Sequence, residues 1–522
     1  MTEDPAEALA PPAAPSGPSG PAGPDEPPAP APVASPASSR VERLEIDGVP
    51  VYWMPDARRS MAALQFRVGR SDEAFADMGI THLVEHLAFF RLGRREHVNG
   101  FVDNIRTVFV VHEDPPEIAT FLREISQAIH DLPIDRLPDE ARILRAEAIR
   151  RTPSIFDQLL WLRFGSSAQG LVQMPEYGLS RIGAAELRAW ATSRFSAGNA
   201  AVWIAGPMPE GIRLELPAGP RMPVTMAAPI PRLHLPAWTS SRIPGIALGS
   251  VIPREWSSTM GARIVTKRLE QRLRYELGRS YEVSLAYAPI GPDMGHASIY
   301  ASCLDADAVD VRKAFLSVVD EFATKGPEEA ELAEDRASFA KYRDDPDSGF
   351  GELDRAVHDE LLGVPYQTPE EHAAEHALVT PEQIRAAFNE DLDRAILIGP
   401  VGEAPHGLSA RPWQHYPDWS DVTVAGRRFD RTTKRFPWSK TTETLIVGPD
   451  GVTWLGQPPQ LLTVRFADCV GLVIDTDGAR VLQVRDGFRV VVRASEWKNG
   501  TAAVAAVDRA VPPELVIRLP RT

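Results

Sequence analysis

The stretch from Gly79 to Phe90, GITHLVEHLAFF, constrains the fold of this chain more than any other. Its apolar side chains recur at helical spacing and predict an α-helix. They are Ile80, Leu83, Val84, Leu87 and Phe90. His82, Glu85 and His86 are spaced as H-x-x-E-H, so a helix brings all three to one face. Two imidazoles one turn apart can bind one zinc ion, and the adjacent carboxylate can take a proton from water. The alternative is a pair of hydrogen-bonded core histidines.

A zinc site of this kind needs a third protein ligand from another element. The run from Leu137 to Arg150 predicts a second helix, with Pro138 near its start and acidic residues in its first turn. Glu140 and Glu147 are seven residues apart, so they lie on one face of that helix, two turns from each other. A glutamate on a helix is usually exposed to solvent. The two glutamates become candidates only because the H-x-x-E-H motif precedes them.

An H-x-x-E-H helix followed by two glutamates seven apart resembles the insulinase/pitrilysin family of zinc metallopeptidases, which includes mitochondrial processing peptidase. The resemblance implies that His82, His86 and Glu147 hold one zinc ion per chain. It also implies that Glu85 is the general base and that Glu140 orients a ligand imidazole. The activity implied is zinc-dependent hydrolysis of peptide bonds.

Two further segments are similar to substrate-binding parts of that family. Asn99 matches the asparagine of an Asn-Ala-x-Thr strand beside which the substrate lies, although Gly100 replaces the alanine and the threonine is absent. Arg274 and Tyr281 match an arginine and a tyrosine, seven apart, that reach the substrate in active members. A guanidinium fork and a phenol suit a peptide carbonyl or a developing oxyanion. Taken alone, they would be a surface arginine and a strand tyrosine.

The chain as a whole divides into a tail, two similar units and a smaller final region. Residues 1–40 are rich in Pro, Ala, Gly and Ser and cannot bury enough apolar surface to fold. The second unit repeats the plan of the first but has the segment Lys267–Leu273 where the first has H-x-x-E-H, so we expect one zinc site. The predicted parts are a disordered tail over 1–40, a zinc-binding unit over 41–215, a linker over 216–236, a second unit over 237–415, a linker over 416–440 and a C-terminal domain over 441–522.

The expected fold class is α+β: two homologous mixed α/β units of the insulinase/pitrilysin type, then a small β-rich domain. The C-terminal region alternates short strands with Asp-Gly turns and resembles a pleckstrin-homology-like barrel closed by a helix near 501–510. It carries no candidate catalytic residue, so docking and structural cover are both open as its role. Elsewhere the patterns predict a hairpin over 41–53, strands over 61–68, 199–206 and 245–251, and helices over 115–131, 136–151, 155–168, 184–195 and 259–277.

Composition restricts the partners. A net charge of −15 argues against a nucleic-acid footprint, and no apolar run reaches membrane-spanning length. The acidic N-terminus lacks the apolar segment of a secretory signal, which favours the cytoplasm. The two cysteines, Cys303 and Cys469, predict no disulfide framework.

The expected function is therefore that of a zinc metalloendopeptidase acting on peptide substrates. Two alternatives stay open: a non-catalytic binding or scaffold paralogue, and a maturation protease dedicated to one modified peptide. Members of the family arrange four units around a closed chamber, whereas this chain has two. We therefore expect a homodimer with composite active sites, in which Arg274 and Tyr281 of one copy face the zinc-bearing unit of the other.

Overall fold

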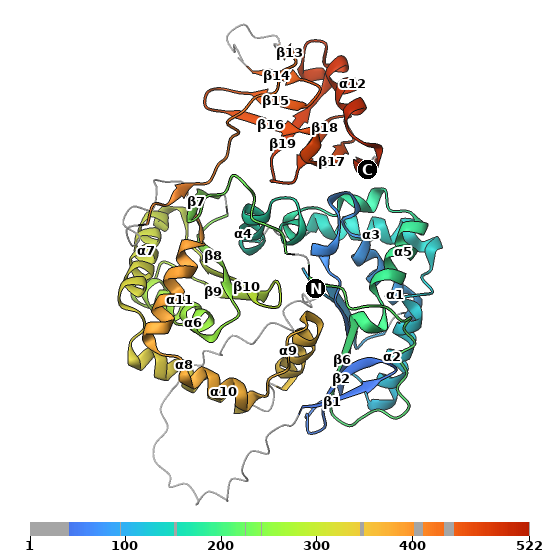
Figure 1. Cartoon of the computed structure of the whole chain (residues 1–522), viewed down its shortest axis with the longest axis vertical. Coiled ribbons are helices and arrows are strands. Elements are labelled where there is room, and N and C mark those ends of the chain that lie inside the picture. The colour runs from blue at the N-terminus through green and yellow to red at the C-terminus, as the bar shows by residue number, and fades with distance from the viewer. Residues whose placement is uncertain are drawn as a thin grey trace, which may run out of the picture.

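Figure 1 shows two α/β units side by side and a smaller domain of strands at one end. The computed structural model describes residues 41–520 except for 94, 151–153, 225, 242, 345–348, 401–410 and 433–442. The expected tail over 1–40 lies outside the described residues. The predicted fold class is confirmed: two mixed α/β units precede a β-rich domain.

The first unit is built on a six-stranded sheet with the order β1-β2-β6-β3-β5-β4. Its strands are β1 (Glu42–Ile46), β2 (Val49–Met54), β3 (Met61–Phe66), β4 (Val98–Val102), β5 (Thr107–Val111) and β6 (Ala200–Ala205). Neighbouring strands are antiparallel except for the parallel pair of β2 and β6. The central strands β3, β5 and β6 are buried almost throughout, because both faces of the sheet are covered. Strand β4 forms one edge.

One face of this sheet is covered by helices of the same unit. The helices of this part of the chain are α1 (Ile80–Leu92), α2 (Pro115–Ala128), α3 (Leu137–Arg150), α4 (Ile155–Phe164) and α5 (Ala184–Arg194). Helix α1 lies in the centre and packs against α2, α3 and α5. Its Leu83, Val84 and Leu87 join Phe109 and Val202 of the sheet in one buried cluster. The helix that carries H-x-x-E-H is therefore fixed at the centre of the first unit.

The second unit repeats this plan. Its sheet has the order β12-β7-β11-β8-β10-β9, again with the second and third strands parallel. The strands are β7 (Ala237–Ser240), β8 (Ile246–Pro253), β9 (Val283–Pro289), β10 (Met294–Ala301), β11 (Ile396–Gly399) and β12 (Gln414–His415). The helices are α6 (Trp256–Glu270), α7 (Ala308–Lys325), α8 (Glu329–Asp344), α9 (Gly349–Leu362), α10 (Pro369–Leu378) and α11 (Pro381–Asp393). Helices α6 and α8 thus correspond to α1 and α3.

The two units exchange one helix each. Helix α4 packs its Leu159 and Leu162 on the second sheet, against Ala247 and Ile398. Helix α9 packs its Leu353 and other apolar residues on the first sheet, against β2 and β6. Two hydrogen bonds reinforce the packing of α9 on the first sheet. Tyr52 donates one to Glu360 at 2.8 Å, and Gln65 donates one to Asp354 at 2.7 Å. Each sheet is thus closed on its second face by a helix from the other unit.

The C-terminal domain consists of two four-stranded sheets and one helix. The first sheet contains β13 (Arg427–Asp430), β14 (Thr444–Val447), β15 (Gly451–Leu455) and β16 (Leu461–Arg465). The second contains β17 (Cys469–Ile474), β18 (Arg480–Val484), β19 (Arg489–Val492) and β20 (Val516–Arg518). Helix α12 (Gly500–Ala510) packs Ala503 and Val507 against residues of both sheets.

Three segments differ from the expectations. The helix expected over 259–277 begins earlier, at Trp256, and changes into a π-helical turn at Gln271–Glu276. The helix expected over 155–168 ends at Phe164, because Gly165 has a φ of 64°. The segment 416–440, expected as a linker, contributes β13 to the C-terminal domain. Among the described helices, none is both long and apolar enough to span a bilayer.

Candidate metal centre

Helix α1 places the motif between the protein core and a polar site. Ile80, Leu83, Val84 and Leu87 point into the core, whereas Phe90 of the predicted stripe is 47% exposed and lies under the guanidinium of Arg136; Glu85 is buried, with 5% of its surface exposed. The start of α1 is stabilised by Glu73, which precedes the H-x-x-E-H motif in the sequence. The carboxylate of the buried Glu73 accepts hydrogen bonds from the backbone N–H groups of Gly79 and Thr81, both at 2.9 Å. These bonds satisfy N–H groups that have no partner within the helix.

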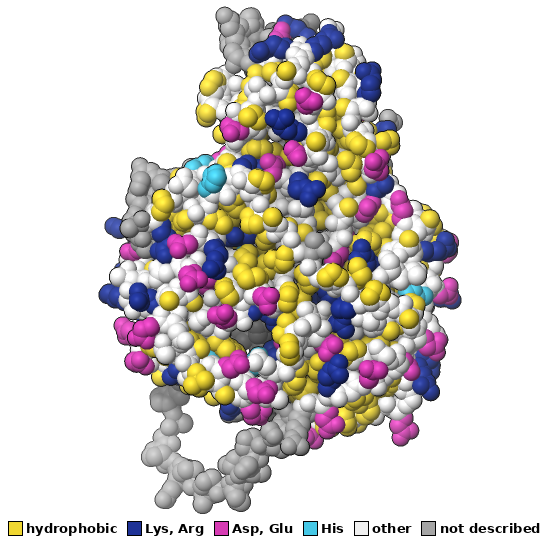
Figure 2. Space-filling model, viewed as in Figure 1, with side chains coloured by type: hydrophobic (Ala, Val, Ile, Leu, Met, Phe, Trp, Pro, Cys, Tyr) yellow, Lys and Arg dark blue, Asp and Glu magenta, His cyan; other side chains and the backbone are white. Residues whose placement is uncertain are grey.

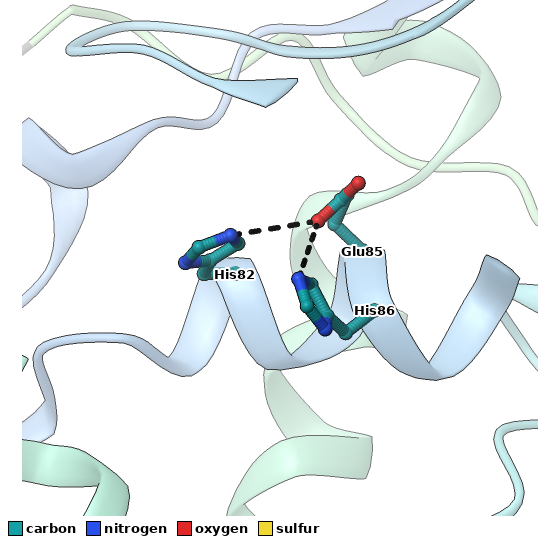
Figure 3. A group of neighbouring side chains, drawn as sticks. All are labelled: His82, Glu85 and His86. Atoms are coloured by element: carbon teal, nitrogen blue, oxygen red, sulfur yellow. Dashed lines mark ion pairs between the residues drawn. The ribbon is translucent and has the colours of Figure 1, made fainter. Parts of the chain in front are cut away.

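His82, Glu85 and His86 converge as Figure 3 shows. The Nε2 atoms of His82 and His86 lie 3.7 Å and 3.8 Å from Glu85 Oε2. One potential ligand atom from each residue lies within 4.8 Å of the others, and the imidazole rings are nearly perpendicular. Two imidazoles at this separation can bind one zinc ion, and the carboxylate of Glu85 lies within reach of a water molecule on that ion.

A second layer of carboxylates holds both imidazoles from behind. Nδ1 of His86 lies 3.3 Å from Glu140 Oε2, and Nδ1 of His82 lies 3.0 Å from Glu176 Oε1. An ionised carboxylate only accepts hydrogen bonds, so each Nδ1 carries the proton. In the neutral tautomer that follows, each Nε2 keeps its lone pair on the side where the two rings converge.

Glu147 lies on α3, two turns after Glu140. Its Oε2 is 3.8 Å from Nε2 of His86, and its side chain is half exposed. The structure therefore brings Glu147 to the outer side of the same imidazole that Glu140 holds from behind. Glu147 thus reaches His86 from a second helix, whereas the group of donor atoms that lie within 4.8 Å of one another consists of His82, Glu85 and His86.

The electrostatic environment of Glu85 suits a base that works near neutral pH. Burial raises the pKa of Glu85 to about 7, and the nearby negative charges of Glu147 and Glu176 act in the same direction. His86 opposes this shift. A carboxylate with a pKa near the working pH can both accept and return a proton.

Strand β4 runs beside the motif and carries Asn99 and Gly100. The side chain of Asn99 accepts a hydrogen bond from its neighbour's N–H at 2.9 Å. At Gly100 the strand lies close to side chains of α1. A Cβ atom there would lie 2.7 Å from Glu85 Oε1 and 2.4 Å from Cε2 of Phe89. Glycine in place of alanine thus has a physical reason in this chain: the strand passes too close to Glu85 for a methyl group.

Arg274 and Tyr281 lie in the second unit, away from the motif. Arg274 is in the π-helical turn after α6, where its guanidinium donates to Glu270 Oε1 at 3.2 Å. Tyr281 is 88% exposed. Figure 1 places α6 and α1 in separate units on opposite sides of the body. The structure of one chain therefore does not bring these two residues to its own H-x-x-E-H helix.

Sequence reasoning missed Glu176 and Glu73. Glu176 follows His82 by 94 residues and stands just before a short 3₁₀ turn, Tyr177–Ser180. No spacing rule links a lone glutamate in irregular structure to a helix that far upstream. Glu73, seven residues before Ile80, could have been considered as a helix cap, since acidic residues favour helix N-termini.

Comparison with solved structures gives the fold a context. A domain from Pseudomonas fluorescens described as an inactive domain of an M16 peptidase matches with a TM-score of 0.57 at 16% identity, over 69% of this chain and 98% of that one. The first half of the periplasmic protease PqqL from Escherichia coli matches with a TM-score of 0.54 at 15% identity, over 73% and 95% of the two chains. The full-length PqqL structure is matched over 56% of its length.

These likenesses show the fold, which is that of M16 peptidases, the insulinase type. The resemblance seen in the sequence is thus supported at the level of architecture. The neighbours include both proteases and a domain described as inactive, so the fold alone does not separate an enzyme from a non-catalytic paralogue. No protein-family model and no curated protein matches the sequence.

Proposed function

We propose that this protein is a zinc-dependent metalloendopeptidase that hydrolyses peptides or short unfolded precursors. One observation carries the proposal: two imidazole Nε2 atoms converge on a buried glutamate, while a carboxylate holds the opposite nitrogen of each ring. A pair of core histidines would need hydrogen-bond partners but no such convergence. The donor chemistry fits zinc, with His82, His86 and Glu147 as the ligands.

The residues around the site have separate roles in peptide hydrolysis. A zinc ion held there would polarise a water molecule and the scissile carbonyl. Glu85 takes the proton from the attacking water and delivers it to the leaving amine. Glu140 and Glu176 keep the imidazoles of His86 and His82 in one orientation and one tautomer during this cycle.

We further propose that an extended peptide lies along β4. Among the described strands, β4 pairs with β5 and forms the edge of its sheet, so its other side offers backbone groups to a partner strand. A peptide bound there passes beside Gly100, whose lack of a side chain leaves the approach to Glu85 open. Asn99 is the side chain on this strand that we assign to the substrate.

The test is a peptide-library cleavage assay with mass-spectrometric readout, run with and without a zinc chelator. We expect cleavage that the chelator abolishes and that Glu85→Gln lowers by about two or more orders of magnitude with zinc still bound, because an amide cannot accept the proton. Glu334→Gln is the matched control, since Glu334 is a helical glutamate beside Lys267 in the second unit. Retained cleavage in Glu85→Gln would exclude Glu85 as the base.

The same assay separates the alternatives. A non-catalytic paralogue binds peptides from the library and cleaves none, and one structural neighbour is a domain described as inactive. A dedicated maturation protease uses the same chemistry but cleaves one sequence or none in a general library. A cytoplasmic location stays a prediction, and PqqL, which shares the fold, is a periplasmic protease.

We also propose a C₂ homodimer with composite active sites. The support is that Tyr281 is exposed although it matches a substrate-binding position, and that this chain spans 56% of a full-length protease of the same fold. In such a dimer, Arg274 and Tyr281 of one copy serve the zinc-bearing unit of the other. Mixing inactive Glu85→Gln with inactive Arg274→Ala tests this arrangement. Partial recovery of activity supports shared sites, and no recovery after confirmed subunit exchange excludes them.

A further inference from the structure

Glu176 connects the candidate metal centre to a part of the chain with no catalytic residue. It is 7% exposed, and its carboxylate lies 3.0 Å and 3.3 Å from Nδ1 of His82. The guanidinium of Arg70 lies 3.4 Å from Oε1 of the same carboxylate. Glu176 sits in irregular structure before a single 3₁₀ turn, so no helix or strand of its own fixes its position.

The C-terminal domain packs against the segments on either side of this glutamate. The ring of Tyr177, the next residue, lies 5.6 Å from the ring of Phe75. Phe75 and Leu171 form a buried apolar cluster with Val473 of β17 and Ile517 of β20. Strand β20 contacts the 3₁₀ turn Tyr177–Ser180, and β17 contacts the turn that contains Phe75. The cluster therefore spans the boundary between the first unit and the C-terminal domain.

Close backbone approach shows how tightly this boundary is packed. Gly471 in β17 lies directly on the ring of Phe75, where a Cβ atom would be 2.4 Å from Cδ1. A second contact fixes the orientation of the domain. Ser166 donates its backbone N–H to the carbonyl of Arg485 at 2.8 Å and accepts a hydrogen bond from Gln483 Nε2 at 2.9 Å. The apolar cluster around Phe75 and the hydrogen bonds of Ser166 lie apart, so together they restrict rotation of the C-terminal domain relative to the first unit.

We propose that the C-terminal domain is a positioning element for the metal centre. By packing against Phe75 and Tyr177, it holds Glu176 against His82, and Glu176 holds the imidazole with Nε2 directed at the metal. This inference rests on the zinc site of the proposed function and assigns a role to the last domain. It makes Glu176 a positioning residue, because it acts on the metal through His82.

Zinc affinity is the direct measurement, by competition of the full-length protein with a chromogenic chelator. We expect Glu176→Ala to weaken zinc binding by about tenfold or more, the range seen when an outer partner of a metal-bound histidine is removed. Gly471→Ala should weaken it in the same direction, because the added methyl group displaces β17 from Phe75. Val473→Ala, which empties part of the same cluster, gives an independent measurement if Gly471→Ala folds poorly. Val507→Ala is the control, since it truncates the core of the C-terminal domain away from this boundary.

A double-mutant cycle separates positioning from general destabilisation. If the domain acts through Glu176, Gly471→Ala has no further effect on zinc affinity once Glu176 is alanine. Additive losses would overturn the proposal, as would unchanged affinity in Glu176→Ala or a loss in Val507→Ala equal to that in Gly471→Ala. A cobalt-substituted protein gives a second readout, because its visible spectrum reports ligand geometry. Failure of the wild-type protein to bind zinc would instead refute the proposed function.

Discussion

The two units carry the same sheet and the same pair of helices, but the space between those helices differs in chemistry. Between α1 and α3 of the first unit, imidazole faces carboxylate: His86 lies 3.3 Å from Glu140 and 3.8 Å from Glu147. Between α6 and α8 of the second unit, cations face carboxylates. Their pairs are Arg263 with Asp335 at 2.8 Å, Lys267 with Glu334 at 3.3 Å, and Arg268 with Glu331.

The comparison shows what a metal centre requires beyond the fold. An Arg or Lys opposite a carboxylate neutralises it and occupies its oxygens, so the second unit has its charges matched internally. A neutral imidazole cannot neutralise the carboxylates around it, and its Nε2 lone pair stays available. In the first unit, arginines pair with the outer carboxylates, Arg70 with Glu176 and Arg136 with Glu140, and a doubly charged cation would balance Glu85 and Glu147 beside the imidazoles. The same scaffold thus supports either an ion-pair seam or a metal site, depending on a few side chains.

The largest expected difference between the units is in zinc content. Purified protein should contain one zinc ion per chain, and His82→Ala should contain almost none, because only one imidazole and a half-exposed carboxylate remain. His372→Ala is the matched control in the second unit, where His372 lies 3.2 Å from Arg355. Elemental analysis by mass spectrometry measures both. Two zinc ions per chain, or unchanged zinc in His82→Ala, would contradict the comparison.

A smaller effect, on catalytic activity, is expected from adding one methyl group to Gly100 of the first unit, and none from the same change at Gly261 of the second. Gly100→Ala should lower kcat/KM by about 10- to 100-fold, since the new Cβ would force β4 away from Glu85 and displace the substrate strand. Gly261→Ala in α6 meets its nearest neighbour, Ile384, at 3.4 Å and should leave activity unchanged. Steady-state kinetics on one cleaved peptide compare the two variants. Equal activities would mean that β4 does not guide the substrate.

The ion pairs between α6 and α8 of the second unit should affect the stability of the fold and not zinc binding. Arg268 donates to Glu331 at 2.6 Å and to the carbonyl of Gly326 at 3.0 Å, and it stacks on Phe322. We expect Arg268→Ala to lower the free energy of unfolding by about 2 kcal/mol, because the partly buried carboxylate of Glu331 loses its charged partner and keeps the N–H of Glu328, while the carbonyl of Gly326 loses this donor. Urea denaturation measures this change. Zinc content should stay at the wild-type value, and a loss of zinc would show that the units are coupled.

The last effect depends on pH and concerns a buried carboxyl group of the second unit. Burial raises the pKa of Asp391 from 3.8 to about 7, with Arg394 opposing the shift. Between these two pH values the folded protein keeps a proton that the unfolded chain has lost, so this group makes stability fall as pH rises. Asp391→Asn removes the ionisation, so it should raise the free energy of unfolding relative to the wild type at pH 8 and leave it nearly unchanged at pH 4. Thermal unfolding at both pH values tests this, and equal shifts would exclude the burial of Asp391 as the cause.

Much of the fold was predictable because the local patterns are strong. The apolar stripe of α1, the alternating strands of the first hairpin and the Asp-Gly turns of the C-terminal domain each specify their element through neighbours in sequence. The repeat of a helix and a final strand predicted two similar units. The metal candidates followed from one helix face in α1 and one in α3. Within each helix the candidates lie within two turns of one another, and the resemblance to the insulinase/pitrilysin family links the two helices.

The remainder depends on contacts between segments that are distant in sequence. Glu176 reaches His82 across 94 residues and has no local signature, while Glu73 caps α1 from a loop and has only the general preference of acidic residues for helix N-termini. The position of the C-terminal domain could not be inferred, because Ile517 and Phe75 carry no pattern that pairs them. The exchange of α4 and α9 was also beyond local reasoning. An apolar face on a helix indicates that the face is buried, but it does not identify the sheet against which the helix packs. In Figure 2, hydrophobic side chains gather where these parts meet, and both signs of charge are interspersed over the rest of that face.

The helix exchange has a consequence for how the chain can be divided. Leu159 of α4 and Leu353 of α9 are fully or almost fully buried in contacts that cross between the halves. Each half made separately would leave one wide apolar sheet surface facing water, a state prone to aggregation. A single proteolytic nick in the connection between the units would leave the two fragments interlocked as one particle. The two units are therefore held together by the exchanged helices as well as by the chain that connects them.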